Sequence, residues 1–291
     1  MKLKNEERAA YAMVGPALLC LLIFVMYPMC LAVYLSLTNS TVGRTGSFVG
    51  IDNFVWLFKT RSFRTTLCNV GIYLAVAVSL KTVLGILLAL LLNRVSICPR
   101  LVRALILLPW VAPIALTTLA WRWLFDPRYS SINWALRSLG LIETNIPWLS
   151  FPTFARVAVI TVNVWRGLPF FAVNFLAGLK GIPQELYEAA KVDGAGPFAQ
   201  FRYITLPSLA PVLAIVLLFS TVMTISDFPI VFVLTRGGPI DTTHLLATLA
   251  YQVGLTGGFI GRGAAISLFL APVLFVVVFL LLKLTRERWT W

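Results

Sequence analysis

Charged residues are scarce in this chain of 291 residues: they make up 12% of it, whereas 59% of the residues are hydrophobic. Ordinary soluble domains are about half apolar and roughly one quarter charged. The apolar residues also come in long blocks instead of being spread along the chain. These features exclude a soluble enzyme, a disordered tail protein and a disulfide-stapled secreted domain, and they predict an integral membrane protein.

Residues and motifs for catalysis are also missing. The chain has one histidine, His244, and four scattered cysteines, whereas a structural zinc site needs four ligands close together. It contains no Gly-x-x-x-x-Gly-Lys-Ser/Thr, no His-Glu-x-x-His and no Gly-x-Ser-x-Gly. We therefore predict no catalytic residue, no metal site and no cofactor bound by this chain, so that energy must come from another chain or from an ion gradient.

A formal net charge of +13 would suit a nucleic-acid-binding protein. The lysines and arginines, however, lie in short runs at the ends of the apolar blocks, which is typical of the cytoplasmic face of a membrane protein. The expected partner is the lipid bilayer, and no nucleic acid is expected.

Six apolar blocks approach the roughly 20 residues that a helix needs to cross a bilayer. The predicted fold is therefore an all-α integral membrane protein with six transmembrane helices in a single domain, residues 11–284, between tails at 1–10 and 285–291. The first block is longer than the 7–15 apolar residues of a signal peptide, so it is expected to remain as a span. The predicted spans are 11–37, 70–92, 101–125, 154–179, 208–234 and 263–284.

Six spans place both termini on one side of the membrane. Basic residues are denser in the short segments of that side than in the longer loops of the other, which predicts that both tails are cytoplasmic. The basic residues of these short segments are Lys2, Lys4, Arg8, Arg94, Arg100, Arg103, Lys180, Lys191, Arg202, Lys283, Arg286 and Arg288.

Two polar stripes run along predicted spans four and five. Their members recur at helical spacing, so each stripe shares one helical face. A charge exposed to lipid costs several kcal/mol, so these faces should meet a water-filled cavity or a partner. The alternatives are an ion pair between Arg166 and Asp227, or hydrogen bonds that only hold the helices together. The candidate residues of a substrate pathway are Asn163, Arg166, Phe170, Asn174, Ser220, Thr224 and Asp227.

Other residues within the spans predict local features. Lys81 in span two is a candidate for an ionisable group within the membrane, although extension of its side chain to the membrane interface is favoured. The prolines of spans three and four remove helix hydrogen bonds, so they are expected to kink or break their helices. These prolines are Pro109, Pro113 and Pro169.

The loop between spans four and five, residues 180–207, predicts two short helices. Pro183 suits the first turn of one helix, and Gly194 suits its C-terminal stop. Pro197 opens the second helix, and Pro207 is expected to end it. An ordered loop with small residues at its centre indicates a surface held by another protein.

This loop resembles the EAA loop of ABC-importer permeases. The likeness consists of Glu188-Ala-Ala, a glycine at 194 and Ile204-x-Leu-Pro207. In that family the loop forms a cytoplasmic coupling helix that docks in a groove of the ATPase subunit. The resemblance implies the same role here for Glu188, Ala189, Ala190, Asp193, Gly194, Ile204, Leu206 and Pro207.

Further motifs look like the carbohydrate-uptake branch of these permeases, on the side of its first permease, related to the maltose and glycerol-3-phosphate permeases. They are Phe48-Val-Gly-Ile-Asp-Asn-Phe54, Leu108-Pro, Asp126-Pro, Gly181-Ile-Pro and Arg236-Gly-Gly-Pro. The resemblance implies a heterodimer with a second permease, two ATPase subunits that use ATP and Mg, and an extracytoplasmic solute-binding protein. It also implies a location in a bacterial or archaeal plasma membrane.

The implied function is import of a sugar or sugar-like solute, such as an oligosaccharide, a polyol or a glycerol phosphate ester, by alternating access. An ATP-independent secondary transporter or channel is the main alternative, and a membrane assembly factor or receptor is a third. Arg166 would suit an anionic solute unless it simply pairs with Asp227.

Overall fold

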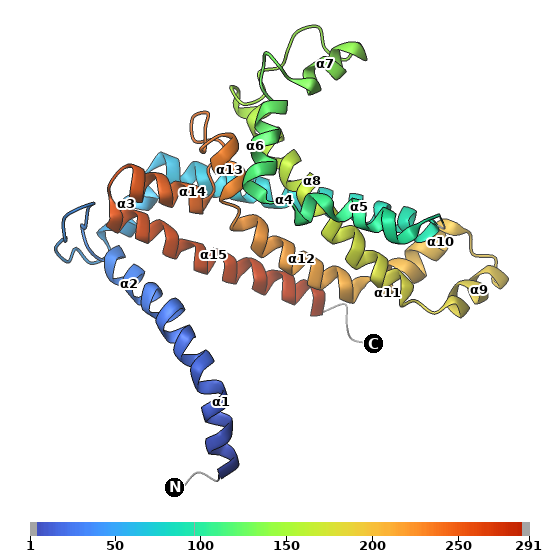
Figure 1. The fold of residues 1–291 in the computed structure, drawn as a ribbon, viewed down its shortest axis with the longest axis horizontal. Coiled ribbons are helices and arrows are strands. Elements are labelled where there is room, and N and C mark those ends of the chain that lie inside the picture. The colour runs from blue at the N-terminus through green and yellow to red at the C-terminus, as the bar shows by residue number, and fades with distance from the viewer. Residues whose placement is uncertain (1–4, 96, 287–291) are drawn as a thin grey trace. The chain divides into compact units, whose positions relative to one another are not determined.

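The computed structural model describes residues 5–95 and 97–286, and these residues are almost entirely helical (Figure 1). Within them, β pairing is limited to two isolated bridges, Thr38 with Phe48 and Thr41 with Arg44. The predicted all-α fold is confirmed. The chain divides into two compact units, one made of the residues up to Arg61 together with Leu249–Ala271, and the other made of Ser62–Thr248 with the residues from Pro272 onward.

The smaller unit begins with one long helical stretch. Most of its side chains between residues 11 and 35 are exposed and apolar, for example Phe24 at 74% exposure. A helix that is apolar all round belongs in a membrane, so this stretch matches the first predicted span. Its segments are α1 (Asn5–Leu21), η1 (Leu22–Met26) and α2 (Tyr27–Ser36).

The rest of the smaller unit fixes the loop that follows this span. Asn53 donates its Nδ2 hydrogens to the carbonyl oxygens of Ser36 and Thr38, each at 2.8 Å. Arg262 lies between the rings of Trp56 and Phe259, with centroids 4.5 and 4.9 Å from its Cζ. The helices involved are α3 (Asp52–Lys59), η3 (Gln252–Thr256) and the start of α15 (Ile260–Arg286), and α14 (Leu246–Tyr251) precedes η3.

The larger unit is built around α8 (Pro152–Lys180). This helix packs against α5, α12 and α13, and α13 also packs against α6. The core on α8 is aromatic, with Phe171 and Phe175 fully buried against aliphatic residues of α4 and α12. The other helices are α4 (Arg61–Arg94), α5 (Pro99–Val111), α6 (Ile114–Leu124), α7 (Ser131–Ser138), α9 (Gln184–Val192), α10 (Pro197–Gln200), η2 (Phe201–Thr205), α11 (Leu206–Ser208), α12 (Ala210–Ile225) and α13 (Pro229–Leu234).

Five helical stretches of the described residues are long and apolar enough to cross a membrane, and α5 with α6 would make a sixth. The third predicted span is not straight, because α5 and α6 meet at 87°. Pro113 has no N–H to continue α5, and Ala112 before it is extended with ψ of 144°. Only this one of the three prolines ends its helix, since Pro109 and Pro169 lie inside α5 and α8.

The fifth predicted span is also interrupted. The chain leaves the helix between α12 and α13, at residues 226–228, although the sequence predicts one continuous helix over 208–234. The unwound turn contains Asp227, whose carboxylate is buried and hydrogen-bonded. Its Oδ1 also accepts the backbone N–H of Ile230, in the first turn of the helix that follows the break.

The loop after α8 forms the expected first helix, α9, which ends at Val192 and is followed by Asp193 and by Gly194 in the left-handed conformation, with φ of +79°. The second part differs from the prediction. Pro207 does not end the helix, because it lies in α11, which continues directly from η2. The chain is therefore helical from Pro197 to Ser208 and leads directly to α12 (Figure 1).

The close approach of α4 and α8 depends on Gly85. A Cβ at this position would lie 2.5 Å from Cβ of Phe171. We expect Gly85→Val to cost about 1–3 kcal/mol through overpacking and to lower the unfolding midpoint in detergent by several degrees. Gly71→Val is the matched control, because a Cβ at Gly71 on the same helix has no atom within 4 Å. Equal midpoints for the two variants would contradict the packing described here.

Candidate functional site

A cavity of about 240 Å³ lies inside the larger unit. A single water needs roughly 10–15 Å³ by this measure, so the space suits a solute or several waters. Its walls come from α4, α5, α6, α8, α12 and the break before α13. The structure brings together here six of the residues that the polar stripes predict, namely Asn163, Arg166, Phe170, Ser220, Thr224 and Asp227.

Asn174 is the stripe residue that does not line this cavity. Its Nδ2 donates to the backbone oxygen of Phe170 at 2.7 Å, one turn earlier on α8. The side chain is therefore folded back on its own helix.

Asp227 joins three helices at the break in span five. Its Oδ2 accepts hydrogen bonds from the Tyr73 hydroxyl at 2.6 Å and from Asn163 Nδ2 at 2.9 Å. Its Oδ1 accepts the backbone N–H of Ile230 at 3.4 Å, in the first turn of α13. The side chain is 6% exposed, so these three donors replace water around the carboxylate.

Lys81 does not reach the membrane interface as the sequence predicts. Its side chain is 3% exposed, and Nζ donates to Oγ1 of Thr224 at 2.9 Å. The aliphatic stem lies against Gly167, where an added Cβ would be 2.6 Å from Cδ of the lysine. A glycine on α8 therefore provides the space that lets this cation enter the cavity.

Tyr73 is a residue of this network that the sequence analysis missed. Tyr73, Ala77, Lys81 and Gly85 recur every four residues, and all four are buried. This spacing places them on one face of α4. The spacing of four residues between the tyrosine, the alanine, the lysine and the glycine was the signal that could have identified this buried face of α4.

Arg166 is not paired with Asp227. Within the part of the chain that the structure describes, its guanidinium makes no hydrogen bond or ion pair, and its buried Nε has no partner. Its Cζ instead lies 5.4 Å from the centroid of the Trp110 ring, a cation–π contact. The sequence left open an ion pair between Arg166 and Asp227, and the structure excludes it.

One wall of the cavity is aromatic. The Trp110 ring stacks on Phe170 with centroids 4.9 Å apart, and Phe170 lies 4.9 Å from Phe219. Other residues of the lining carry polar atoms that are buried without a hydrogen-bond partner among the described residues: Asn163 Oδ1, Arg166 Nε and Ser220 Oγ. Buried polar atoms normally have a partner, so this arrangement suits a ligand with both apolar faces and polar groups.

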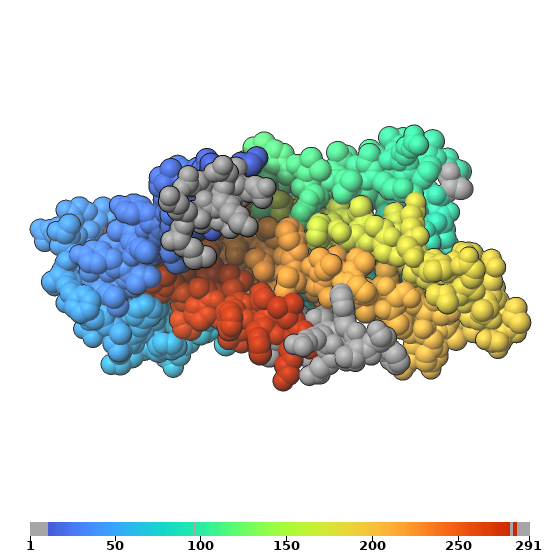
Figure 2. Space-filling view, turned by 90° about the horizontal axis from the view of Figure 1, so that it is seen from below, coloured from blue at the N-terminus to red at the C-terminus, as the bar shows by residue number. Residues whose placement is uncertain are grey.

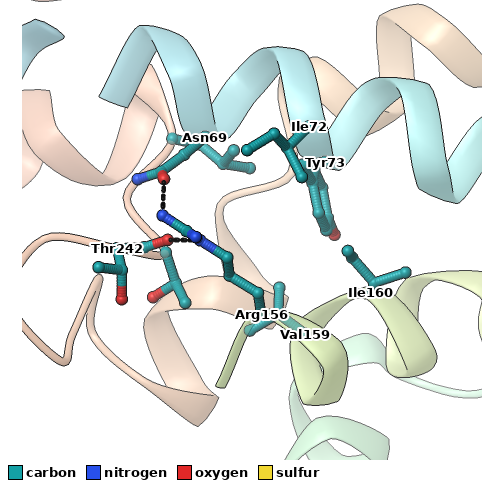
Figure 3. A pocket seen from close by; sticks show the side chains of 9 residues that line it. Asn69, Ile72, Tyr73, Arg156, Val159, Ile160 and Thr242 are labelled. Atoms are coloured by element: carbon teal, nitrogen blue, oxygen red, sulfur yellow. Dashed lines mark hydrogen bonds between the residues drawn. The ribbon is translucent and has the colours of Figure 1, made fainter. Parts of the chain in front are cut away.

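A second, smaller cavity of about 20 Å³ lies beside Arg156 (Figure 3). Arg156 Nε donates to the backbone oxygen of Thr242 at 3.0 Å, and Nη2 donates to Asn69 Oδ1 at 3.2 Å. Asn69 Nδ2 in turn donates to the backbone oxygen of Asp241 at 2.7 Å. This network ties the loop after α13 to α4 and α8, and the space is sufficient only for about one water.

The α9–α11 segment forms one end of the larger unit (yellow in Figures 1 and 2). Tyr187 and Thr205 hold its two halves together through their hydroxyls, 3.0 Å apart. Apolar side chains on it point outward, with Val192 89% and Phe198 75% exposed. Of the residues predicted to contact an ATPase, Glu188, Ala189, Asp193, Gly194, Leu206 and Pro207 are exposed, and Ala190 and Ile204 are half-buried.

The apolar helices and the cavity define an α-helical integral membrane protein that has several polar side chains in the cavity wall. Among the described residues, no group of three or more His, Cys, Asp or Glu side chains could hold a metal ion. Residues 81–288 match the family described as binding-protein-dependent transport system inner membrane component. The chain belongs to this family, and the resemblance to ABC-importer permeases of the carbohydrate-uptake branch is confirmed.

Similar proteins cover nearly the whole chain. The trehalose/maltose transport system permease protein MalF of Thermococcus litoralis is 36% identical over 291 residues, which is 99% of this chain and 97% of that protein. The sulfoquinovosyl glycerol transport system permease protein SmoG of Agrobacterium fabrum is 31% identical, with coverage of 98% and 92%.

Among solved structures, a chain of a bacterial ABC transporter that imports the acidic polysaccharide alginate superimposes with a TM-score of 0.83. It is 26% identical, and the match covers 97% of this chain and 96% of that one. The same match is found in that transporter's complex with an alginate pentasaccharide-bound periplasmic protein.

The Asp227 network generates a stability prediction. We expect Tyr73→Phe to cost about 1–3 kcal/mol, because a buried carboxylate loses one of its donors and no water replaces it. The measurement is the thermal unfolding midpoint of the purified chain in detergent. Tyr203→Phe, which removes a hydroxyl from an exposed ring, should leave the midpoint unchanged. An unaltered midpoint for Tyr73→Phe would mean that Asp227 does not depend on this hydrogen bond.

Proposed function

We propose that this chain is one permease subunit of an ATP-dependent importer, and that it moves a sugar or sugar-like solute from a binding protein into the cytoplasm by alternating access. In this proposal it crosses a bacterial or archaeal plasma membrane six times, with α5 and α6 as one bent span and both termini in the cytoplasm. The observation that carries the proposal is the exposed α9–Gly194 segment, which has the EAA pattern in a chain of this family.

The α9–α11 segment is the proposed contact with an ATPase subunit. Support comes from its position at one end of the unit and from its exposed apolar side chains. The contact would be made by Glu188, Ala189, Ala190, Asp193 and Gly194. The small residues among them, the two alanines and the glycine, would allow a close approach of the partner. Ile204, Leu206 and Pro207 would carry the movement into α12, since the chain is helical across this junction.

ATP and Mg would be bound by two partner ATPase subunits, since this chain has no P-loop motif. A second, unlike permease would complete the transmembrane pathway, and an extracytoplasmic binding protein would deliver the solute. The alginate transporter complex with its periplasmic protein supports the last of these partners.

The solute class is inferred from relatives and from the cavity. Trehalose or maltose, sulfoquinovosyl glycerol and alginate are the solutes in the names of the similar proteins, and all are carbohydrates or carbohydrate derivatives. The aromatic wall of Trp110, Phe170 and Phe219 suits the apolar faces of sugar rings. Hydroxyl groups of the solute would bond to Asn163, Ser220, Thr224 and Asp227.

Substitution of Gly194 tests the coupling contact. We expect Gly194→Asp to abolish uptake and co-purification of the ATPase, because it places a charge in the docked surface, while the chain still inserts in the membrane. Gly194→Asn is the matched control, since Asn has the same shape, is neutral and tolerates a positive φ. The readout is mass spectrometry of proteins that co-purify with the tagged chain in gentle detergent.

Two outcomes would contradict the proposal. Normal ATPase binding and uptake by Gly194→Asp would remove the coupling assignment. Solute transport by the chain alone in liposomes without ATP would favour a gradient-driven carrier or a channel instead.

Substitution of Ser220 tests the solute pathway. Its Oγ is buried in the cavity wall without a partner, so we expect Ser220→Ala to weaken the apparent uptake affinity about 2–10-fold. The assay is uptake by the complete importer of the solute that the co-purified binding protein holds. Asn174→Ala should leave that affinity unchanged, because Asn174 is bonded to its own helix. If Asn174→Ala weakened the uptake affinity and Ser220→Ala did not, the solute pathway would not run along this cavity.

A further inference from the structure

We propose that the cavity binds an anionic group of the solute, a carboxylate, sulfonate or phosphate ester on a polyhydroxylated molecule, through Arg166 and Lys81. This inference rests on the proposed function and narrows the substrate class from sugars in general to sugars that carry an anionic group.

The first support is the balance of charge around the cavity. Its lining contains three side chains with ionisable groups: Lys81, Arg166 and Asp227. Two basic groups and one carboxyl group leave one basic group without an acidic counterpart. Asp227 is also engaged by Tyr73, Asn163 and the Ile230 N–H, and it makes no ion pair with either cation.

The second support is the number of donors that remain unused. A lysine ammonium has three donors, and Lys81 uses one of them on Thr224. An arginine guanidinium has five, and Arg166 donates none of them to the described residues. The contact with Trp110 is a cation–π contact, with Cζ 5.4 Å from the ring centroid, and it occupies no hydrogen-bond acceptor. A guanidinium with unused N–H groups can bind both oxygens of a planar or tetrahedral oxyanion.

The third support is the free-energy cost of leaving the guanidinium of Arg166 without a counter-ion. A cation within a membrane protein is expensive unless it is paired or hydrated, and a neutral sugar that displaced water from Arg166 would leave it unpaired. An oxyanion would supply the missing partner. The neutral groups nearby, Asn163 Oδ1 and Ser220 Oγ, would then accept or donate hydrogen bonds to hydroxyls of the same solute.

The test compares two probes that differ mainly in charge, D-glucuronate and methyl α-D-glucoside, both radiolabelled. Their equilibrium binding is measured on the purified complete importer in lipid nanodiscs, without ATP. We expect glucuronate to bind at least about tenfold more tightly, the lower end of the range for a charge-assisted hydrogen bond.

Variants assign the preference to its residues. Arg166→Gln should reduce the ratio of the two affinities to about one. Arg166→Lys keeps the positive charge but loses the planar pair of N–H donors, so it should retain part of the preference for glucuronate. Lys81→Met should lower the ratio to an intermediate value. Arg64→Gln removes a positive charge from an exposed position on α4 and should leave the ratio as in the unaltered protein.

Four results would overturn the anion site. These are equal binding of the two probes, preference for the glucoside, no measurable binding of glucuronate, or a preference for glucuronate that survives both Arg166→Gln and Lys81→Met. The last result would locate the anion preference outside this cavity.

The proposed function is tested separately in the same preparation. If ATPase subunits co-purify and a neutral sugar is imported with ATP, but glucuronate is not preferred, the permease assignment stands and only the anion site fails. If no ATPase co-purifies, the proposed function fails, while the affinity ratio can still be measured on the chain in nanodiscs.

Discussion

The buried carboxylate of Asp227 is the contact on which the interior of the larger unit depends. It accepts hydrogen bonds from α4, from α8 and from the first turn of α13, at the point where span five leaves the helix. A break at membrane depth exposes peptide groups that lipid cannot satisfy. Asp227 accepts one hydrogen bond from the chain beyond the break and one from each of two neighbouring helices. These three hydrogen bonds therefore connect the broken span to the helices that form the cavity walls.

The two ends of the larger unit serve different purposes in this arrangement. At one end, hydrogen bonds of Arg156 and Asn69 connect the loop after α13 to α8 and α4. At the other end, α9 stands away from the bundle with exposed apolar side chains. The cavity lies between them, bordered by the bend before α6 and by the break before α13. In a permease with this design, movement of α9 would reach the cavity through the continuous helical path from α10 to α12.

Much of this fold could be predicted from the sequence, because long apolar runs need no tertiary information to be recognised. The short helix α9 was also predictable, since Pro183 and Gly194 mark its two ends by local chemistry alone. The 87° bend between α5 and α6 could not be predicted from the sequence. A proline can end a helix, as Pro113 does, or lie inside one, as Pro169 does in α8, and packing decides which of these happens. Helical spacing identified six residues of the cavity but missed Lys81, whose burial depends on a glycine of another helix.

That glycine, Gly167, links the electrostatics of the cavity to a position that carries no side chain. The stem of Lys81 occupies the volume that a Cβ at 167 would need. A larger residue there would require the end of the lysine side chain to leave its present place in the cavity wall. The residues at these two positions should therefore vary together among related transporters.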